Sequence, residues 1–218
     1  MKTNLTELVF ILDRSGSMSG LESDTIGGFN AMLKRQKEET GDAIITTVLF
    51  DDKYELLHDR INIKAIAPIT EKDYYVCGST ALLDAVGKTI QKIVSVQKHT
   101  AEEQRADKIM FVITTDGMEN ASREYTYGRI KQMVEHQKTK YGWEYVFLGA
   151  NIDAVETAAR FGIREDRAAN YHADSEGTIL NYEAVSCVVS ELRANKAIDR
   201  TWKSKIDNDY ERRKNRSR

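Results

Sequence analysis

An unbroken apolar run, Leu8 to Leu12, sets the strongest limit on how this chain can fold, and it leads directly into Asp13. Five apolar residues without alternation are typical of a strand that is buried on both faces, as at the centre of a parallel sheet. A second run, Lys108 to Thr114, leads into Thr115-Asp116-Gly117 in the same way. Two strands of this kind favour an α/β sheet with helices on both faces.

The remaining segments alternate between helical and strand patterns. Apolar residues at helical spacing predict helices at 21–39, 81–94 (with Thr80 as its N-cap), 127–141, 153–161 and 178–194. Short β-branched runs predict strands at 6–12, 43–50, 54–63, 108–114, 144–148 and 168–171. The segment 54–63 alternates, which suits an antiparallel edge strand. The predicted fold is a doubly wound, Rossmann-like, three-layer α/β/α arrangement with a mostly parallel sheet.

Composition narrows the classes of function. The chain has 218 residues and a formal net charge of -2, so no overall field draws it to nucleic acid or to a membrane. Cys77 and Cys187 fit no metal-binding spacing, which favours two reduced thiols and a cytoplasmic protein. The apolar run before Asp13 is too short for a secretion signal, and no segment approaches membrane-spanning length.

The residues after the first strand point to a metal ion. Asp13 is followed by Ser15 and Ser17, with Gly16 between the two hydroxyls. Oxygen-only ligands suit a hard cation, Mg²⁺ more than Zn²⁺. The same residues also occur in ordinary turns at strand ends. Two enzyme motifs are excluded, because Arg14-Ser15 stands where an aspartyl-phosphate phosphatase would place its second Asp, and the spacing differs from Gly-x-Ser-x-Gly.

Two further loops add oxygen atoms, through Thr80 in Gly-Ser-Thr and Asp116 in Thr-Asp-Gly. In an open doubly wound sheet, ligands bind at the carboxyl ends of the strands, where the strand order reverses. If the strands before Asp13 and Asp116 are neighbours, the two carboxylates lie side by side and repel each other unless a cation neutralises them. The predicted metal ligands are Asp13, Ser15, Ser17, Thr80 and Asp116.

Taken together, Asp13-x-Ser15-x-Ser17, Gly-Ser-Thr80 and Thr-Asp116-Gly resemble the metal-ion-dependent adhesion site of von Willebrand factor A domains, in the form found in stand-alone bacterial members. The likeness extends from about residue 5 to residue 194. It implies a six-stranded sheet with one antiparallel edge strand. We therefore expect a von Willebrand factor A domain at residues 1–195 and a charged C-terminal extension at 196–218.

The resemblance also implies a role for each site residue. Ser15 and Ser17 bind Mg²⁺ directly, and Asp13 orients waters or binds through one. Thr80 and Asp116 exchange between direct and water-mediated contact; Mn²⁺ or Ca²⁺ would also fit. A cation that is incompletely neutralised recruits an acidic side chain from a partner protein.

The expected function is a metal-dependent scaffold or adaptor module with no catalytic residues. Around the metal, a rim of Met18, Glu119 and Asn120 is expected to supply specificity. Bacterial relatives often work beside an AAA+ ATPase or in stress and phage-defence gene clusters, which makes such proteins candidate partners.

Two other functions remain open. Metal-assisted hydrolysis of a phosphate ester needs a base or a second metal. Asp51 and Asp52 are the candidates by topology, but they are expected on a hairpin at the far end of the sheet. The four histidines are scattered along the chain. Association with nucleic acid would use the basic tail, Glu211 to Arg218, which is interpreted as a solvated, frayed terminus.

Overall fold

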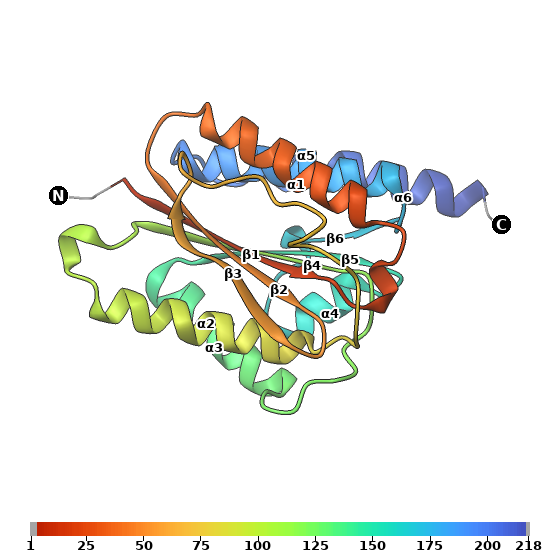
Figure 1. Cartoon of the computed structure of the whole chain (residues 1–218), viewed down its shortest axis with the longest axis horizontal. Coiled ribbons are helices and arrows are strands. Elements are labelled where there is room, and N and C mark those ends of the chain that lie inside the picture. Colours follow the sequence, from red (N-terminus) through yellow and green to blue (C-terminus); the bar gives the residue numbers. More distant parts are fainter. Residues whose placement is uncertain (1–3, 217–218) are drawn as a thin grey trace.

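The computed structural model describes residues 4–216 and shows a sheet between two layers of helices (Figure 1). The strands are β1 (Thr6–Asp13), β2 (Ala43–Phe50), β3 (Tyr54–Asn62), β4 (Lys108–Thr115), β5 (Glu144–Ala150) and β6 (Ala168–Tyr171). The α-helices are α1 (Glu22–Lys37), α2 (Leu82–His99), α3 (Tyr127–Tyr141), α4 (Ala154–Arg160), α5 (Ser175–Arg193) and α6 (Ser204–Arg216). Short 3-10 turns are η1 (Gly16–Met18), η2 (Glu102–Gln104), η3 (Glu165–Arg167) and η4 (Arg200–Lys203). Within the described residues, no helix has the length and apolar character needed to cross a bilayer.

The sheet has the strand order β3-β2-β1-β4-β5-β6, and only β3 runs antiparallel, as the sequence predicts. The order reverses between β1 and β4. Leu12 on β1 pairs with Thr114 on β4, so the carboxyl ends of these two strands lie together. The candidate site therefore occupies the position where open α/β sheets bind their ligands.

Both faces of the sheet are covered, because alternate residues of the central strands point to opposite sides. On one side, Phe10 packs edge-to-face against Phe29 of α1, with ring centroids 5.3 Å apart. On the other side, Phe111 stacks on Tyr145 at 5.0 Å, beneath α2, α3 and α4. Gly28 lets α1 approach α5 closely, since a Cβ at this position would lie 2.3 Å from the Tyr182 ring.

Helix boundaries follow the expected signals, with one correction. Helix α3 has the predicted limits: the Thr126 side chain caps its first turn and Gly142 ends it in the left-handed region, at φ 66°. Helix α2 has Ala81 at its N-cap, so the prediction that Thr80 caps it is wrong. The Thr80 hydroxyl faces the loop after β1 instead.

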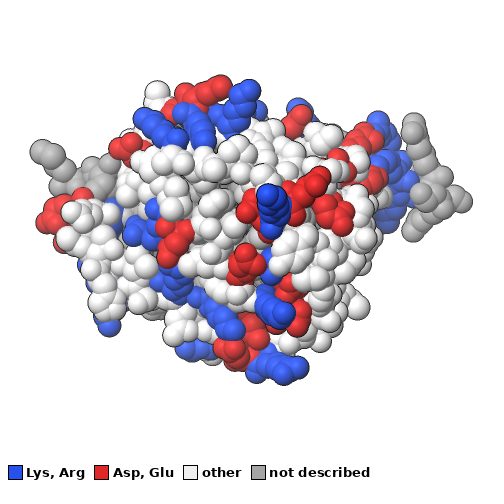
Figure 2. Space-filling model, in the orientation of Figure 1, with Lys and Arg blue, Asp and Glu red and all other residues white. Residues whose placement is uncertain are grey.

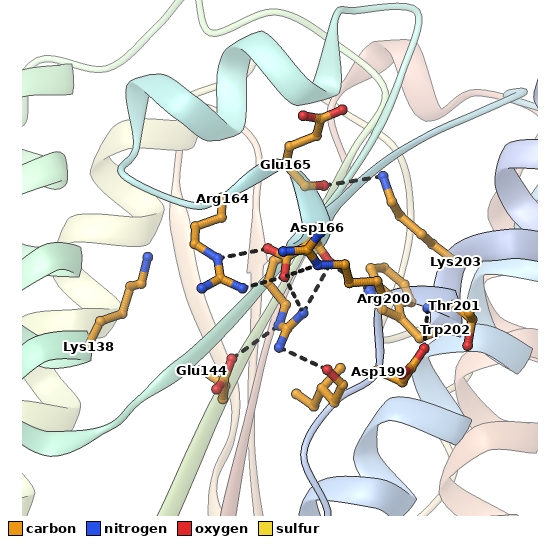
Figure 3. A network of polar contacts seen from close by, with 12 residues as sticks. Lys138, Glu144, Arg164, Glu165, Asp166, Asp199, Arg200, Thr201, Trp202 and Lys203 are labelled. Carbon is orange, nitrogen blue, oxygen red and sulfur yellow. Dashed lines mark hydrogen bonds and ion pairs between the residues drawn. The ribbon is translucent and has the colours of Figure 1, made fainter.

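The charged segment after α5 is a folded part of the molecule. Ile198 and Trp202 are 8% exposed and Ile206 is 2% exposed, all in the core on the α1–α5 side. Figure 3 shows how η4 is fastened beside the start of β6. The Trp202 indole donates to the Asp166 carbonyl at 2.9 Å, and Lys203 Nζ donates to the Ala168 carbonyl at 2.8 Å.

The expectation of a frayed terminus at residues 211–218 is therefore wrong for the part that the structure describes, because this part is helical; the side chains of Glu211, Arg212, Lys214 and Asn215 are exposed to solvent, as expected. Helix α6 extends to Arg216, and its Arg212 and Arg213 form ion pairs within the molecule. Arg213 pairs with Asp174 at 2.5 Å and with Asp209 at 2.6 Å. Residues 217–218 lie outside the described part, and the predicted domain limits, 1–195 and 196–218, stay a prediction.

Candidate metal centre

Asp13 is held rigidly at the end of β1. Its side chain is buried, with the residue 1% exposed. The Ser15 amide donates to Oδ1 at 2.7 Å, and the Thr115 hydroxyl donates to Oδ2 at 2.5 Å. One carboxylate oxygen of Asp13 is thus held by the backbone of the turn that follows it, and the other is held by Thr115 at the end of the neighbouring strand β4.

Three hydroxyls form a cluster beside this carboxylate. Ser15 Oγ lies 3.0 Å from Ser17 Oγ, and Thr80 Oγ1 donates to Ser15 Oγ at 2.9 Å. Gly117 approaches the same cluster: a Cβ there would lie 2.9 Å from Ser17 Oγ and 3.3 Å from Thr80 Oγ1. The residue after Asp116 must be small, because the loop after β4 presses against the two hydroxyls.

Asp116 is the least satisfied group of the site. It is 1% exposed, and neither carboxylate oxygen has a hydrogen-bond partner of normal geometry among the described residues. Burial raises the pKa of Asp116 more than the nearby Ser17 hydroxyl lowers it. A buried carboxylate without partners is costly, so this position calls for a proton or a cation.

The two carboxylates affect each other. Burial, with a smaller contribution from the charge of Asp116, raises the pKa of Asp13 to about 6 against the hydrogen bonds from Thr115 and Ser15. No Lys, Arg or His within residues 4–216 forms an ion pair with either carboxylate. Two buried acids beside three hydroxyls fit a hard divalent cation.

The structure brings all five predicted residues to this one edge. The site is a mixed set of carboxylates and hydroxyls, and across residues 4–216 there is no group of three or more His, Cys, Asp or Glu side chains that could hold a metal ion.

Two residues position the ligands of the site: Tyr74, which carries no recognisable sequence signal, and Asn120, which was expected only at its rim. The buried Tyr74 hydroxyl donates to the Asp13 carbonyl at 2.5 Å, from a loop distant in sequence. The backbone N–H of Thr80 donates to the side-chain oxygen Oδ1 of Asn120 at 2.9 Å, and the backbone N–H of Asn120 donates to the Thr80 carbonyl at 3.0 Å. Asn120 therefore ties the loop before α2 to the loop after β4.

The predicted rim needs correction. Met18 is 2% exposed and belongs to the core, so it cannot meet a partner. The Glu119 carboxylate accepts the Leu83 amide at 2.8 Å and thereby caps the start of α2. The exposed apolar side chains near the site are Met118, at 74%, and Tyr75, at 50%.

The expected position of Asp51 is also wrong. Strand β2 is parallel to β1, so its carboxyl end, and Asp51 after it, lies at the site edge. Asp51 is buried and accepts from Arg14 Nε at 2.9 Å, while Arg14 also pairs with Glu55 at 2.6 Å. This carboxylate is engaged by a buried guanidinium and is not free to act as a base.

No family model and no curated protein matches the sequence. A von Willebrand factor type A protein from Catenulispora acidiphila is similar in structure, with a TM-score of 0.57 and 12% identity over 85% of this chain and 42% of its own. This chain has the von Willebrand factor type A fold. At this identity, the likeness shows the fold alone.

Two other proteins with the same fold were solved with metal ions. Mussel byssus proximal thread matrix protein 1, with a zinc-occupied MIDAS motif, is 12% identical over 85% of this chain and 46% of its own, with a TM-score of 0.57. Manganese-loaded Plasmodium vivax TRAP is 17% identical over 82% of this chain and 72% of its own, also with a TM-score of 0.57. The chain thus spans less than half of the mussel and Catenulispora proteins.

Proposed function

We propose that this von Willebrand factor A domain is a metal-dependent protein-interaction module that binds an acidic side chain of a partner. The observation that carries the proposal is the pair of buried carboxylates, Asp13 and Asp116, which lack a cationic partner among the described residues and lie beside clustered hydroxyls. A divalent cation bound here would supply positive charge and a coordination position for a carboxylate from outside.

Each ligand has a distinct task. Ser15 and Ser17 offer neutral oxygens for direct contact. Asp13 is already held by the Ser15 amide and the Thr115 hydroxyl, which suits a residue that orients waters. Asp116, with no hydrogen bonds that fix its oxygens, is free to approach or to leave the cation. Thr80 joins the two loops through Ser15.

The surface around the site supports contact with a protein. Met118 and Tyr75 present apolar area beside the polar centre, an arrangement common at the core of protein interfaces. The oxygen-only ligands suit Mg²⁺, or the manganese of one similar structure, better than the zinc of the other. A cytoplasmic location agrees with the two free, exposed thiols of Cys77 and Cys187, and an AAA+ ATPase or a stress or defence component stays a candidate partner.

The alternatives have less support. A phosphate-ester hydrolase would need a free base, and the nearest extra carboxylate, Asp51, is paired with Arg14. A nucleic-acid protein would need a basic surface. Figure 2 shows both signs of charge interspersed over the face in view, and Arg212 and Arg213 pair with acids of α5 and α6.

Calorimetric titration of the metal-free chain with MgCl₂ tests the metal site. We expect one site per chain, lost in Asp13→Ala and retained in Asp52→Ala, which removes an exposed carboxylate from the neighbouring turn. An unchanged isotherm in Asp13→Ala would refute the assignment. Capture of partners from cell extract in Mg²⁺ and in EDTA then tests the interaction. Partners that remain bound in EDTA do not use the metal.

A further inference from the structure

Helices α2 and α3 enclose a groove on the face of the sheet that does not carry α1 and α5. The groove consists of two adjoining hollows of about 480 Å³ and about 270 Å³, which share Val94 of α2 and Gln137 of α3. The groove is narrow at Gly87 of α2, because the Tyr125 ring packs directly against this residue. A Cβ at position 87 would lie 2.3 Å from the ring atom Cδ1 of Tyr125. The Tyr125 hydroxyl donates to Gln91 at 2.6 Å and closes this end.

The floor of the groove is apolar. Ile90 is fully buried, while Val94 and Met133 are only half-buried and present carbon atoms to the hollow. Trp143 is 6% exposed and forms part of the floor of the smaller hollow. The floor can therefore receive apolar side chains from a ligand.

The lining carries charge of one sign only. Lys98, Arg105, Arg129 and His136 line the two hollows, and no Asp or Glu lines either of them among the described residues. The Arg129 and Lys98 side chains form no ion pair within residues 4–216, so both charges are available to an anionic ligand.

A buried acceptor lies where the hollows meet. Gln137 is 6% exposed, and its side-chain oxygen Oε1 has no hydrogen-bond partner among the described residues. Buried polar atoms are normally paired in native proteins. This oxygen is itself enclosed by the protein, so the groove offers a ligand its apolar floor and its basic side chains rather than this acceptor.

We propose that the α2–α3 groove docks a peptide segment of a partner protein that carries both acidic and apolar side chains. The floor takes the apolar side chains, and the basic rim pairs with the carboxylates. A peptide fits better than a nucleic acid, because phosphates would leave the apolar floor uncovered. The groove contains none of the proposed metal ligands, so this second docking site acts without the metal.

The probe is a displayed library of random peptides, selected on the whole chain in buffer with EDTA. We expect the selected peptides to be rich in Asp and Glu and to contain apolar residues. Fluorescence anisotropy should show affinity about tenfold lower for Arg129→Glu and for Lys98→Glu, since charge reversal replaces attraction with repulsion. Lys131→Glu is the matched control on α3, because Lys131 lies outside the groove, and it should bind as the parent does.

Several results would overturn the proposal. One is a failure to select any peptide. Another is a selected peptide that binds the Arg129→Glu and Lys131→Glu variants with equal affinity. A third is tight binding of a single-stranded oligonucleotide that is lost in the Arg129→Glu variant. The Asp13→Ala variant separates the two sites. Peptide binding in EDTA that persists in Asp13→Ala supports an independent groove even if the metal proposal fails, whereas its loss in that variant contradicts independence.

Discussion

The hydroxyl of Thr80 donates a 2.9 Å hydrogen bond to the hydroxyl of Ser15 and so joins the loop before α2 to the loop after β1. The same loop before α2 is tied to the loop after β4 through Asn120. The three loops of the site are therefore mechanically linked without any bound ion. A change at Thr80 should alter how the site is assembled more than whether the protein folds.

Replacement of Thr80 by Ala tests this link. We expect Mg²⁺ affinity to fall about fivefold, because one hydrogen bond contributes about 1 kcal/mol, while Asp13, Ser15 and Ser17 still hold the ion. Binding of an acidic partner should weaken more than metal binding. Thr80→Ser keeps the hydroxyl and should restore both affinities in calorimetry. Complete loss of metal binding in a folded Thr80→Ala variant would contradict this division of roles.

Metal affinity should depend on pH through Asp13. Its pKa is raised to about 6 by burial, and a divalent cation binds the carboxylate form. Mg²⁺ affinity is therefore expected to hold above pH 6 and to fall about tenfold per pH unit below it. Calorimetry at a series of pH values measures this, with circular dichroism to confirm that the fold persists. Constant affinity between pH 7 and 5 would contradict the proposed role of Asp13.

In EDTA, Asp13 should affect stability in the opposite direction. Its ordinary pKa of 3.8 applies to the unfolded chain, so between about pH 6 and pH 4 the folded state binds the proton more tightly. The contribution of Asp13 to the free energy of unfolding should therefore increase as the pH falls through 6, and level off near 4. Comparison of the parent with Asp13→Asn, whose side chain does not titrate, isolates this contribution.

The Asp116→Asn variant should be more stable than the parent in the absence of metal, and it should lose Mg²⁺ binding. The buried carboxylate has no hydrogen-bond partner among the described residues, so removal of its charge should raise the free energy of unfolding at pH 8 in EDTA by about 1 to 3 kcal/mol. Thermal melting measures the gain, and titration with Mg²⁺ should show the lost affinity. Asp52→Asn, at an exposed carboxylate, should change neither quantity.

The segment after α5 should contribute substantially to stability. Trp202→Ala removes a buried ring and its hydrogen bond to the Asp166 carbonyl, and is expected to cost about 3 to 5 kcal/mol. Ile206→Ala should cost about 2 to 4 kcal/mol. Urea denaturation measures both, with the exposed Lys205→Ala as a neutral control. Unchanged midpoints would mean that this segment does not support the core.

The central fold could be predicted from the sequence because runs such as Leu8 to Leu12 contain no polar residue that could face solvent. The limits of α3 were equally accessible, since Gly142 marks its end. The site edge followed from Asp13 and Asp116 at the ends of two buried runs. The direct metal role of the five ligands remains a prediction.

Other features depend on tertiary contacts that no local pattern reveals. Helix α6 is strongly charged, and its attachment relies on a few buried side chains, chiefly Trp202 and Ile206. The position of Asp51 was misjudged because the direction of β2 relative to β1 decides at which edge it lies. The burial of Met18 depends likewise on how η1 packs.

The way η4 is attached has a consequence for self-association. Strand β6 is the last strand of the sheet, with β5 as its one neighbour among the described strands. Open strand edges are templates for pairing with other chains, and proteins protect them with short strands and lysine side chains. β6 has only four residues, and the Lys203 side chain donates a hydrogen bond to the carbonyl of Ala168, the first of them. The segment that anchors α6 thus also shields this edge against intermolecular strand addition and aggregation.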